Sequence, residues 1–332
     1  MMYIAAENRY AHLTYRKAGK TGLVLPPLSL GCWHNFGDDT PITQQRKILH
    51  TAFDAGINHF DLANNYGTPF GSAEQNLGYF LKNDFKAYRD ELIISSKAGW
   101  DMWPGPYGQG GSSRKYLMAS LDQSLLRLGL DYVDIFYSHR YDPETPLEET
   151  AETLADIVKS GKALYIGISS GYTPELTQQL ADLLAQQHVP IRLHQPLYNL
   201  FNRDIENNLL DKTDELGIGV IVFSPLAQGL LTDRYLTNIP NDSRIGRGSK
   251  YLHEDQVNES LRHKLHQLNV IAQQRGQTLA QLALSWVLRD SKVTSAIIGA
   301  SRPEQVLENL KSLDRLDFDD EELSLIDRVL KA

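Results

Sequence analysis

The chain has 332 residues, of which 42% are hydrophobic and 22% charged, and its net charge at pH 7 is −8. This acidic balance excludes a broad nucleic-acid-binding surface, and no apolar run is long enough to predict insertion into a membrane. The single cysteine, Cys32, excludes an internal disulfide and a cysteine-based metal cluster and favours the reducing cytoplasm. No basic segment followed by an apolar run opens the chain, so we expect no secretory signal.

Short apolar runs alternate with helical patterns along most of the chain. A small hairpin is expected over residues 13–25, turning at Lys20-Thr21-Gly22, ahead of the first strand. Strands are predicted near residues 28–31, 57–60, 92–96, 133–138, 163–168, 191–195, 218–223 and 295–299. Helices are predicted near residues 42–55, 72–82, 113–128, 147–159, 174–187, 203–216 and 303–311.

Eight predicted strands separated by helices favour a closed α/β barrel over an open doubly wound sheet. We therefore predict a single domain over residues 1–332, a (β/α)8 TIM barrel preceded by the hairpin. Phe318, Leu323 and Leu330 follow a helical spacing near the C-terminus. They predict an amphipathic helix that packs across the barrel.

Two stretches interrupt the alternation. Residues 100–112 are too rich in glycine and aromatic residues for a helix or strand, and they follow the third predicted strand. Their aromatic side chains either form the wall of a substrate pocket or pack on the barrel as an ordinary surface loop, and both interpretations stay open. Residues 226–254 contain arginines and glycines that suit a mobile flap over an anion.

Four polar residues lie at or just beyond the ends of three consecutive predicted strands: Asp61, Tyr66, Lys97 and His139. Each alone has a structural explanation, such as a helix cap, a packed loop residue, a solvated lysine or a core histidine. In a parallel barrel, however, the carboxyl ends of the strands share one rim, where active sites lie. We therefore expect an acid, a phenol, an amine and an imidazole to meet there.

This set of groups suits the reduction of a carbonyl. A free tyrosine has a pKa of about 10, and a neighbouring ammonium lowers it by stabilising the phenolate. Asp61 would keep Lys97 charged and oriented, Tyr66 would donate the proton, and His139 would polarise the carbonyl oxygen. Paired glycosidase carboxylates are missing, and the histidines lack metal-ligand spacing, so no catalytic metal is expected.

Three separated motifs then identify a resemblance. Residues 56–67, Gly-Ile-Asn-His-Phe-Asp-Leu-Ala-Asn-Asn-Tyr-Gly, are similar to the signature of the NADP-dependent aldo-keto reductases. Residues 161–169 and 298–305 match two further motifs, in the correct order. Segments 33–37 and 134–140 resemble the branch that contains the potassium-channel β-subunits and, more closely, bacterial reductases of L-glyceraldehyde 3-phosphate and methylglyoxal.

The resemblance implies catalytic roles for Asp61, Tyr66, Lys97 and His139. It implies a substrate pocket formed by Trp33, Tyr66, Trp100, His139 and Arg140, although Arg140 would equally suit a surface ion pair. It also implies NADP(H) as cofactor, with Gln195 bonding the nicotinamide carboxamide and Tyr198 stacking on the ring. The implied cofactor contacts are Gly31, Cys32, Trp33, Asp61, Ser169, Gln195, Tyr198, Ser224, Pro225, Leu226, Gln228, Gly229, Arg234, Arg244, Gly299, Ser301, Arg302, Gln305, Glu308 and Asn309.

Three local features bear on the cofactor. Ser301 is expected to cap a helix beside Arg302, an arrangement that binds a phosphate and favours NADP over NAD, although capped surface helices are common. No Gly-x-Gly-x-x-Gly fingerprint follows the first strand, which argues against a Rossmann-type dehydrogenase. The family usually has Ser-Asn after the fifth strand, whereas this chain has Ser169 and Ser170. We expect the shorter hydroxyl to weaken cofactor binding or to require a bridging water.

The sequence therefore predicts an NADPH-dependent reductase of small aldehydes and ketoaldehydes. The alternative is a cofactor-binding regulatory or redox-sensing partner protein of the channel β-subunit type, against which the complete tetrad argues. A barrel hydrolase or lyase without nicotinamide would require the cofactor motifs to be coincidental. The branch resemblance further implies a homo-oligomer, a tetramer or larger, and the expected partner is a small aldehyde substrate.

Overall fold

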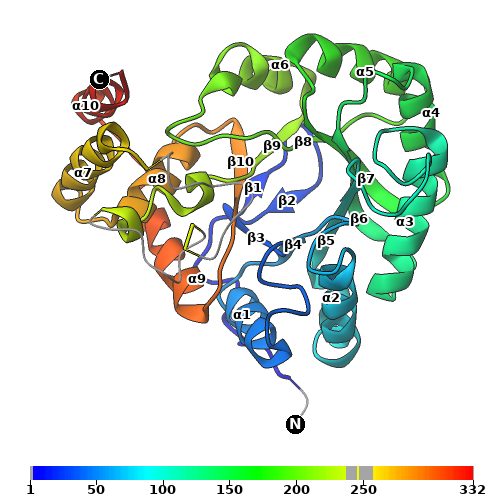
Figure 1. Ribbon diagram of the computed structural model, residues 1–332, viewed down its shortest axis with the longest axis horizontal. Helices are drawn as coiled ribbons and strands as arrows, with labels where there is room; N and C mark the ends of the chain where they lie inside the picture. The colour runs from blue at the N-terminus through cyan, green and yellow to red at the C-terminus, as the bar shows by residue number, and fades with distance from the viewer. Residues whose placement is uncertain (1–2, 237–244, 247–256, 332) are drawn as a thin grey trace.

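The computed structural model describes residues 3–236, 245–246 and 257–331. Its centre is a closed barrel of eight parallel strands in the order β10-β3-β4-β5-β6-β7-β8-β9 (Figure 1). The strands are β3 (Leu28–Gly31), β4 (His59–Asp61), β5 (Ile93–Ala98), β6 (Val133–Arg140), β7 (Ala163–Ser170), β8 (Leu193–His194), β9 (Gly219–Val222) and β10 (Val293–Ile298). The predicted barrel is thus confirmed, with every predicted strand in place.

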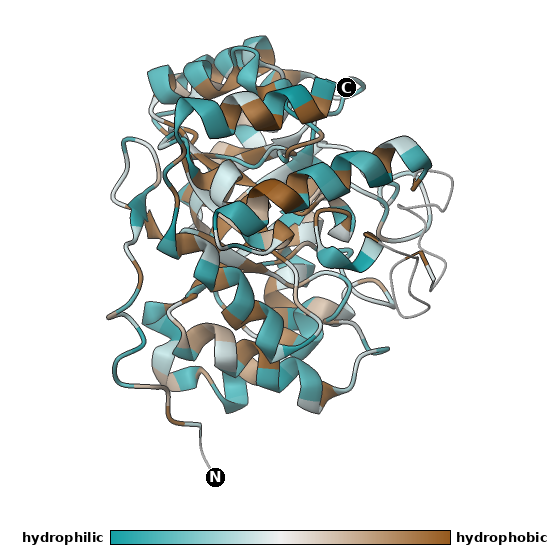
Figure 2. Ribbon diagram, turned by 90° about the vertical axis from the view of Figure 1, so that its left-hand side faces the viewer, coloured by the Kyte–Doolittle hydropathy of each residue, from teal (hydrophilic) through white to brown (hydrophobic). Residues whose placement is uncertain are grey.

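Helices surround the barrel, and Figure 2 shows them with both hydrophilic and hydrophobic faces. The first seven helices are α1 (Ile42–Asp54), α2 (Ser72–Asn83), α3 (Arg114–Leu128), α4 (Leu147–Lys159), α5 (Pro174–Gln186), α6 (Leu209–Leu216) and α7 (Glu259–Gln274). The last three are α8 (Leu279–Leu288), α9 (Pro303–Leu310) and α10 (Asp320–Lys331). Apolar residues on their inner faces form one large core between helices and strands.

Three helical segments differ from the expected pattern. The helix predicted over 203–216 is divided, because Asn208 adopts φ 71°, in the left-handed region, and α6 begins only after it. Helices α7 and α8 were not predicted. The signal for α8 was present, since Thr278 and Gln281 form a capping box in which each side chain accepts a hydrogen bond from the other residue's backbone N–H.

The N-terminal hairpin, β1 (Arg16–Lys17) with β2 (Val24–Leu25), lies across the ring of strands (Figure 1). It covers the end of the barrel at which the strands begin. Gly19 adopts φ 56° and packs so closely on Gly217 that a side chain there would collide with its carbonyl. Ala18 and Leu25 join Tyr137 and other residues of the barrel interior. The hairpin therefore lies away from the opposite end, where the strands finish and where a functional site is expected.

Helix α10 does not pack across the barrel as expected. It lies on the outside of the molecule beside α7 (Figure 1), where Lys264 Nζ donates to the carbonyl oxygen of Leu330. The buried Arg275, at the end of α7, forms an ion pair with Glu322 of α10. These contacts attach the terminal helix to the helical layer. Across the described ranges, no helix is both long and apolar enough to cross a membrane.

Candidate active site

Three strands deliver the predicted tetrad to one rim of the barrel. Asp61 is the last residue of β4, while Lys97 and His139 are the penultimate residues of β5 and β6. Tyr66 lies in the loop that follows β4, and this loop leads into α2. Because β4, β5 and β6 are adjacent and parallel, their carboxyl ends bring these side chains together.

Asp61 and Lys97 form a buried ion pair at the base of the site. Lys97 Nζ lies 2.6 Å from Asp61 Oδ2 and donates a second hydrogen bond of 2.5 Å to the carbonyl oxygen of Leu62. Lys97 is 0% exposed and Asp61 2%. Burial lowers the pKa of Lys97, and the Asp61 carboxylate opposes this effect by stabilising the ammonium. The carboxylate is therefore the group that keeps Lys97 charged.

The half-buried Tyr66 ring is packed between three residues. The ammonium of Lys97 lies 4.9 Å from the ring centroid, and the Trp33 ring stacks on it at 5.4 Å with an interplanar angle of 24°. His139 meets it edge-on, with 5.9 Å between the ring centroids. The tetrad therefore forms one contiguous group in which the phenol lies next to both a cation and an imidazole.

His139 is a neutral imidazole. It is 8% exposed, and burial together with the cations of Lys97 and Arg140 holds the pKa of His139 well below its usual range. Within the described residues, its Nδ1 has no hydrogen-bond partner. A neutral ring has one N–H donor, which suits a group that polarises a carbonyl oxygen without exchanging its own proton.

The two tryptophans of the loop after β5 behave differently: one lies at the rim, as a pocket wall requires, and the other packs on the barrel's helices. Trp100 is 43% exposed and faces the His139 ring at 6.3 Å, so it belongs to the rim. Trp103 instead packs on Tyr116 of α3, with the ring centroids 5.2 Å apart. Arg140 donates from Nε to the carbonyl oxygen of Gly99 at 2.6 Å, and its guanidinium lies 4.8 Å from the Trp100 ring centroid. In the part of the chain that the structure describes, Arg140 forms no ion pair with a carboxylate.

Several predicted cofactor residues line the same rim. Gly31 ends β3 and is followed by the buried Cys32 and the half-buried Trp33. Ser169, at the end of β7, donates to the carbonyl oxygen of Gln195 at 2.7 Å. The Gln195 side chain donates from Nε2 to Asp61 Oδ1 at 3.0 Å. The structure thus joins Gln195 to the tetrad itself.

Tyr198 does not occupy the place expected of a stacking platform. It is 0% exposed, its ring packs on Trp286, and its hydroxyl donates to Glu206 and accepts from Arg289. These contacts hold the ring inside the layer between barrel and helices. Stacking on a nicotinamide is therefore unavailable to Tyr198 in this structure.

The sequence analysis missed Phe223, an aromatic residue at the rim. It follows β9 directly, is half-buried, and packs against the cluster in the barrel interior. Its signal was its place as the last residue of the strand predicted over 218–223, at the end of the barrel where the tetrad was expected. It is the aromatic ring nearest in sequence to the predicted pyrophosphate segment.

That segment, residues 224–229, folds as a compact turn with several left-handed residues. Ser224 adopts φ 52°, Gln228 φ 60° and Gly229 φ 98°, and Gln228 Nε2 donates to Ser224 Oγ at 3.1 Å. Pro225 is buried and Leu226 partly buried. Mixed right- and left-handed backbone forms concave arrays of N–H groups that suit anions. The turn therefore fits a phosphate-bearing cofactor.

The predicted adenosine end is only partly as expected. Helix α9 begins at Pro303 with Arg302, not Ser301, at its N-cap, and Gln305 Oε1 accepts from both the backbone N–H and the hydroxyl of Ser301. The helix therefore has no side-chain cap, and Gln305 instead holds Ser301 just ahead of it. Arg302 is exposed at this helix N-terminus, as an anion site requires.

The remaining predicted contacts are spread around this region. Gly299 is exposed after β10, Asn309 is buried, and Glu308 forms an ion pair with Lys311 at 2.8 Å. Arg234 is exposed within a 3-10 turn, Asp233–Tyr235. Arg244, predicted for the flap, lies outside the described residues.

The comparisons with known proteins agree with this geometry. The model of the Aldo/keto reductase family matches residues 27–331, which include the whole barrel and all four tetrad residues. The chain belongs to the aldo/keto reductase family.

Two kinds of relatives resemble this aldo/keto reductase over nearly its whole length. It is 58% identical to "L-glyceraldehyde 3-phosphate reductase" of Escherichia coli K12, with 99% of this chain and 95% of the relative covered. It is 36% identical to "Probable voltage-gated potassium channel subunit beta" of Oryza sativa subsp. japonica, with 91% and 92% covered. The predicted family and both predicted branches of resemblance are thus confirmed, and the chain is an oxidoreductase.

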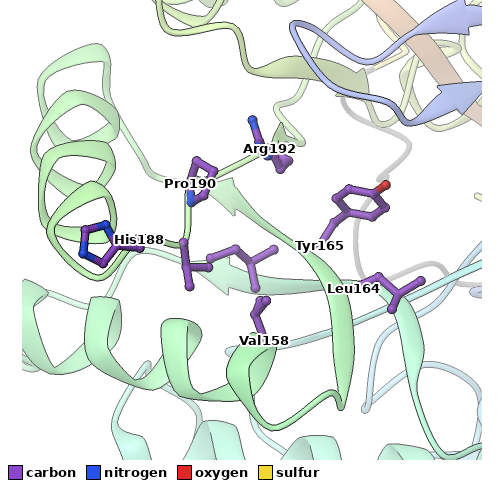
Figure 3. A pocket seen from close by; sticks show the side chains of 8 residues that line it. Val158, Leu164, Tyr165, His188, Pro190 and Arg192 are labelled. Atoms are coloured by element: carbon purple, nitrogen blue, oxygen red, sulfur yellow. The ribbon is translucent and has the colours of Figure 1, made fainter.

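A cavity near the starts of β7 and β8 lies apart from the active-site rim, where the strands finish. It measures about 160 Å³ and lies where β7 begins and the chain enters β8 (Figure 3). Its walls are Val158, Leu164, Tyr165, Ile166, His188, Val189, Pro190 and Arg192. None of these residues belongs to the tetrad or to the predicted cofactor path.

Proposed function

We propose that this aldo/keto reductase catalyses the NADPH-dependent reduction of small aldehydes and ketoaldehydes, such as glyceraldehyde 3-phosphate and methylglyoxal, to alcohols. The observation that carries the proposal is the buried Asp61–Lys97 ion pair beneath the Tyr66 ring, with the neutral His139 at its edge. A phenol next to an ammonium is suited to giving up its proton, because the cation stabilises the phenolate that remains.

Each member of the tetrad then has one task. Tyr66 donates its hydroxyl proton to the carbonyl oxygen as negative charge develops there. Lys97 stabilises the resulting phenolate, and Asp61 keeps Lys97 protonated and in place. His139 donates its single N–H to the same carbonyl oxygen and so orients and polarises it.

NADPH, when bound, supplies the hydride that adds to the carbonyl carbon. The residues that would hold it are Phe223 against the nicotinamide ring, the turn at 224–229 at the pyrophosphate, and Arg302 at the N-terminus of α9 for the ribose phosphate. The fit is supported by the left-handed backbone of the turn and by the exposed arginine at a helix N-terminus. A phosphate on the ribose is the reason to prefer NADP(H) over NAD(H).

The substrate class rests on Arg140 and Trp100. The guanidinium lies on the exposed tryptophan and follows His139 directly, so it places a positive charge beside the proposed reaction centre. A phosphorylated aldehyde offers a matching negative charge. The relative at 58% identity, named for its action on L-glyceraldehyde 3-phosphate, supports the same assignment.

The test is steady-state oxidation of NADPH by the purified protein with glyceraldehyde 3-phosphate, methylglyoxal and benzaldehyde, with Tyr66→Phe in parallel. We expect turnover with the first two aldehydes and a loss of roughly 10²–10⁴-fold in kcat in Tyr66→Phe, because the proton donor is removed. NADPH affinity, measured by fluorescence titration, should stay within about twofold in this variant.

Two outcomes would contradict the proposal. Turnover that survives in Tyr66→Phe would show that another group donates the proton. Tight NADPH binding with negligible turnover on all three aldehydes would favour a regulatory or redox-sensing partner protein, the alternative that the potassium-channel β-subunit relatives raise.

A further inference from the structure

A row of polar side chains crosses the barrel interior and ends at Asp61. The oxygens of Ser295 (β10) and Ser29 (β3) lie 2.7 Å apart, and Ser29 Oγ lies 2.8 Å from Nδ1 of His59 (β4). His59 Nε2 lies 3.0 Å from Oγ of Ser95 (β5), and Ser95 Oγ lies 2.7 Å from Asp61 Oδ1. Ser295, Ser29, His59 and Ser95 are all 0% exposed.

The number of available protons fixes the direction in which each hydrogen bond of this row is donated. The Asp61 carboxylate can only accept, so Ser95 must donate its single hydroxyl proton to Asp61. The Ser95 oxygen then accepts from the Nε2–H of His59. A neutral His59 then accepts at Nδ1, which requires Ser29 to donate to His59 and Ser295 to donate to Ser29. Burial, the largest cause, lowers the pKa of His59 to about 4, in agreement with a neutral ring.

A second buried histidine shows what a purely structural role looks like. His194 of β8 is 1% exposed, and burial likewise lowers its pKa to about 4. Its Nε2 contacts the carbonyl oxygen of Tyr172 at 3.2 Å, and its Nδ1 has no hydrogen-bond partner among the residues that the structure describes. His59 differs because both ring nitrogens are used and because the row of bonds leads to the catalytic carboxylate.

We propose that His59 is a positioning residue for the tetrad: through Ser95, it holds the Asp61 carboxylate oriented toward Lys97. Aligned donors polarise one another, so the His59 N–H strengthens the bond that Ser95 donates. Ser95 and Gln195 both donate to Oδ1 of Asp61, and this leaves Oδ2 to the Lys97 ammonium. The kinetic consequence of this inference rests on the proposed function, whereas its structural consequence does not.

The kinetic experiment compares His59→Leu, which removes both bonds, with His59→Gln, which keeps one donor and one acceptor, and with His194→Leu as the matched control. We expect His59→Leu to lower kcat roughly tenfold while KM and the NADPH Kd stay within about twofold. His59→Gln should recover most of the loss, and His194→Leu should leave kcat unchanged. An equal loss in His59→Leu and His194→Leu would overturn the proposal, because it would show a general effect of altering the core.

A second measurement uses the unmodified protein without substrate. Imidazole ¹⁵N NMR, with the His59 signals assigned by their absence in His59→Gln, should show the proton on Nε2 and a bare Nδ1 near neutral pH. The opposite tautomer would reverse the direction of the hydrogen bonds along the row and overturn the inference, whatever the enzyme reduces.

Two further readouts keep the outcomes separable. The Lys97 ε-methylene NMR signal should move in His59→Leu but stay in place in His194→Leu, and no movement in either would refute the coupling. This holds even if the wild-type protein turns over no aldehyde, a result that would count against the proposed function alone. If His59→Leu does not fold, Ser95→Ala, which breaks the same chain with a smaller change, should also lower kcat without raising KM, and full activity in it would refute the role.

Discussion

At the scale of single residues, the two aromatic candidates for the nicotinamide ring lie in opposite environments. Tyr198 is buried and bonded to Glu206 and Arg289, while Phe223 is half-buried at the end of β9. Both lie at or shortly after the end of a predicted barrel strand, so strand position alone did not separate them. The direction of each side chain depends on the twist of its strand, which no local pattern reveals.

The first prediction separates these two residues. Phe223→Ala should raise the Kd for NADPH by roughly tenfold, because it removes a ring that stacks on the nicotinamide. Tyr198→Phe should leave that Kd unchanged but lower the free energy of unfolding by about 1 kcal/mol, since its hydroxyl loses two hydrogen bonds. Fluorescence titration and urea unfolding measure the two quantities. A large effect of Tyr198→Phe on NADPH affinity would instead support the expectation that Tyr198 stacks on the nicotinamide ring.

A second prediction concerns Ser170, where the family usually has asparagine. Ser170 ends β7 and is half-buried at the rim. Ser170→Asn should lower the Kd for NADPH by a few-fold, because an amide reaches a carboxamide that the shorter hydroxyl does not. An exposed serine, Ser291→Asn, serves as the control. Equal affinities in the parent and in Ser170→Asn, measured by the same titration, would remove the idea that the serine weakens cofactor binding.

At the scale of elements, the loop between β5 and α3 brings substrate-facing and structural residues together. Trp103 anchors the loop on α3, and Gly111 N–H donates to the carbonyl oxygen of Gly99 at 3.1 Å, which holds the loop ends together. Trp100 and Arg140 can then stack at the rim. A loop held in this way presents a preformed wall rather than a disordered lid.

The third prediction tests that wall. Arg140→Met keeps much of the side-chain length but removes the charge, so it should raise KM for glyceraldehyde 3-phosphate at least tenfold and leave KM for methylglyoxal, which has no phosphate, within about twofold. Arg114→Met, at an exposed ion pair with Asp156 on the helical layer, is the control. If both substrates were affected equally, Arg140 would support the loop rather than recognise a phosphate.

At the scale of the whole molecule, the closed barrel lets a row of buried polar residues from four strands share its interior. His59 is buried in that interior, and His194 is buried on the outer face of β8, in register with Ile168 and Val220. Burial lowers the pKa of each to about 4. In the unfolded chain a histidine has a pKa of about 6.5. Below that pH the unfolded state binds more protons than the native state.

The fourth prediction follows from this difference. The contribution of these histidines to stability is complete above pH 6.5 and is lost as the pH falls toward 4, at up to about 1.4 kcal/mol per pH unit for each residue. Urea unfolding at pH 7, 6 and 5 should therefore show a shallower decline in His194→Gln than in the parent. His263→Gln, at an exposed position on α7, should leave the decline unchanged. Identical slopes in the parent and in His194→Gln would exclude this cause of acid sensitivity.

The sequence by itself determined the barrel and the tetrad. Strand and helix periodicities are local, and parallel strands with helical crossovers admit few arrangements, so residues at strand ends had to share a rim. The motif around Asp61 and Tyr66 also indicated the family. The homo-oligomer and the cytoplasmic location stay predictions.

Tertiary structure alone decided the rest. Gln195 reaches Asp61 across 134 positions of sequence, and Ser295 meets Ser29 across 266. Neither contact leaves a local pattern, because both depend on barrel closure and on which side chains the twisted strands turn inward. The same reason explains why Phe223 reaches the rim, why Tyr198 does not, and why α10 packs on α7: each outcome depends on how separate elements pack together, which the properties of a single segment do not specify.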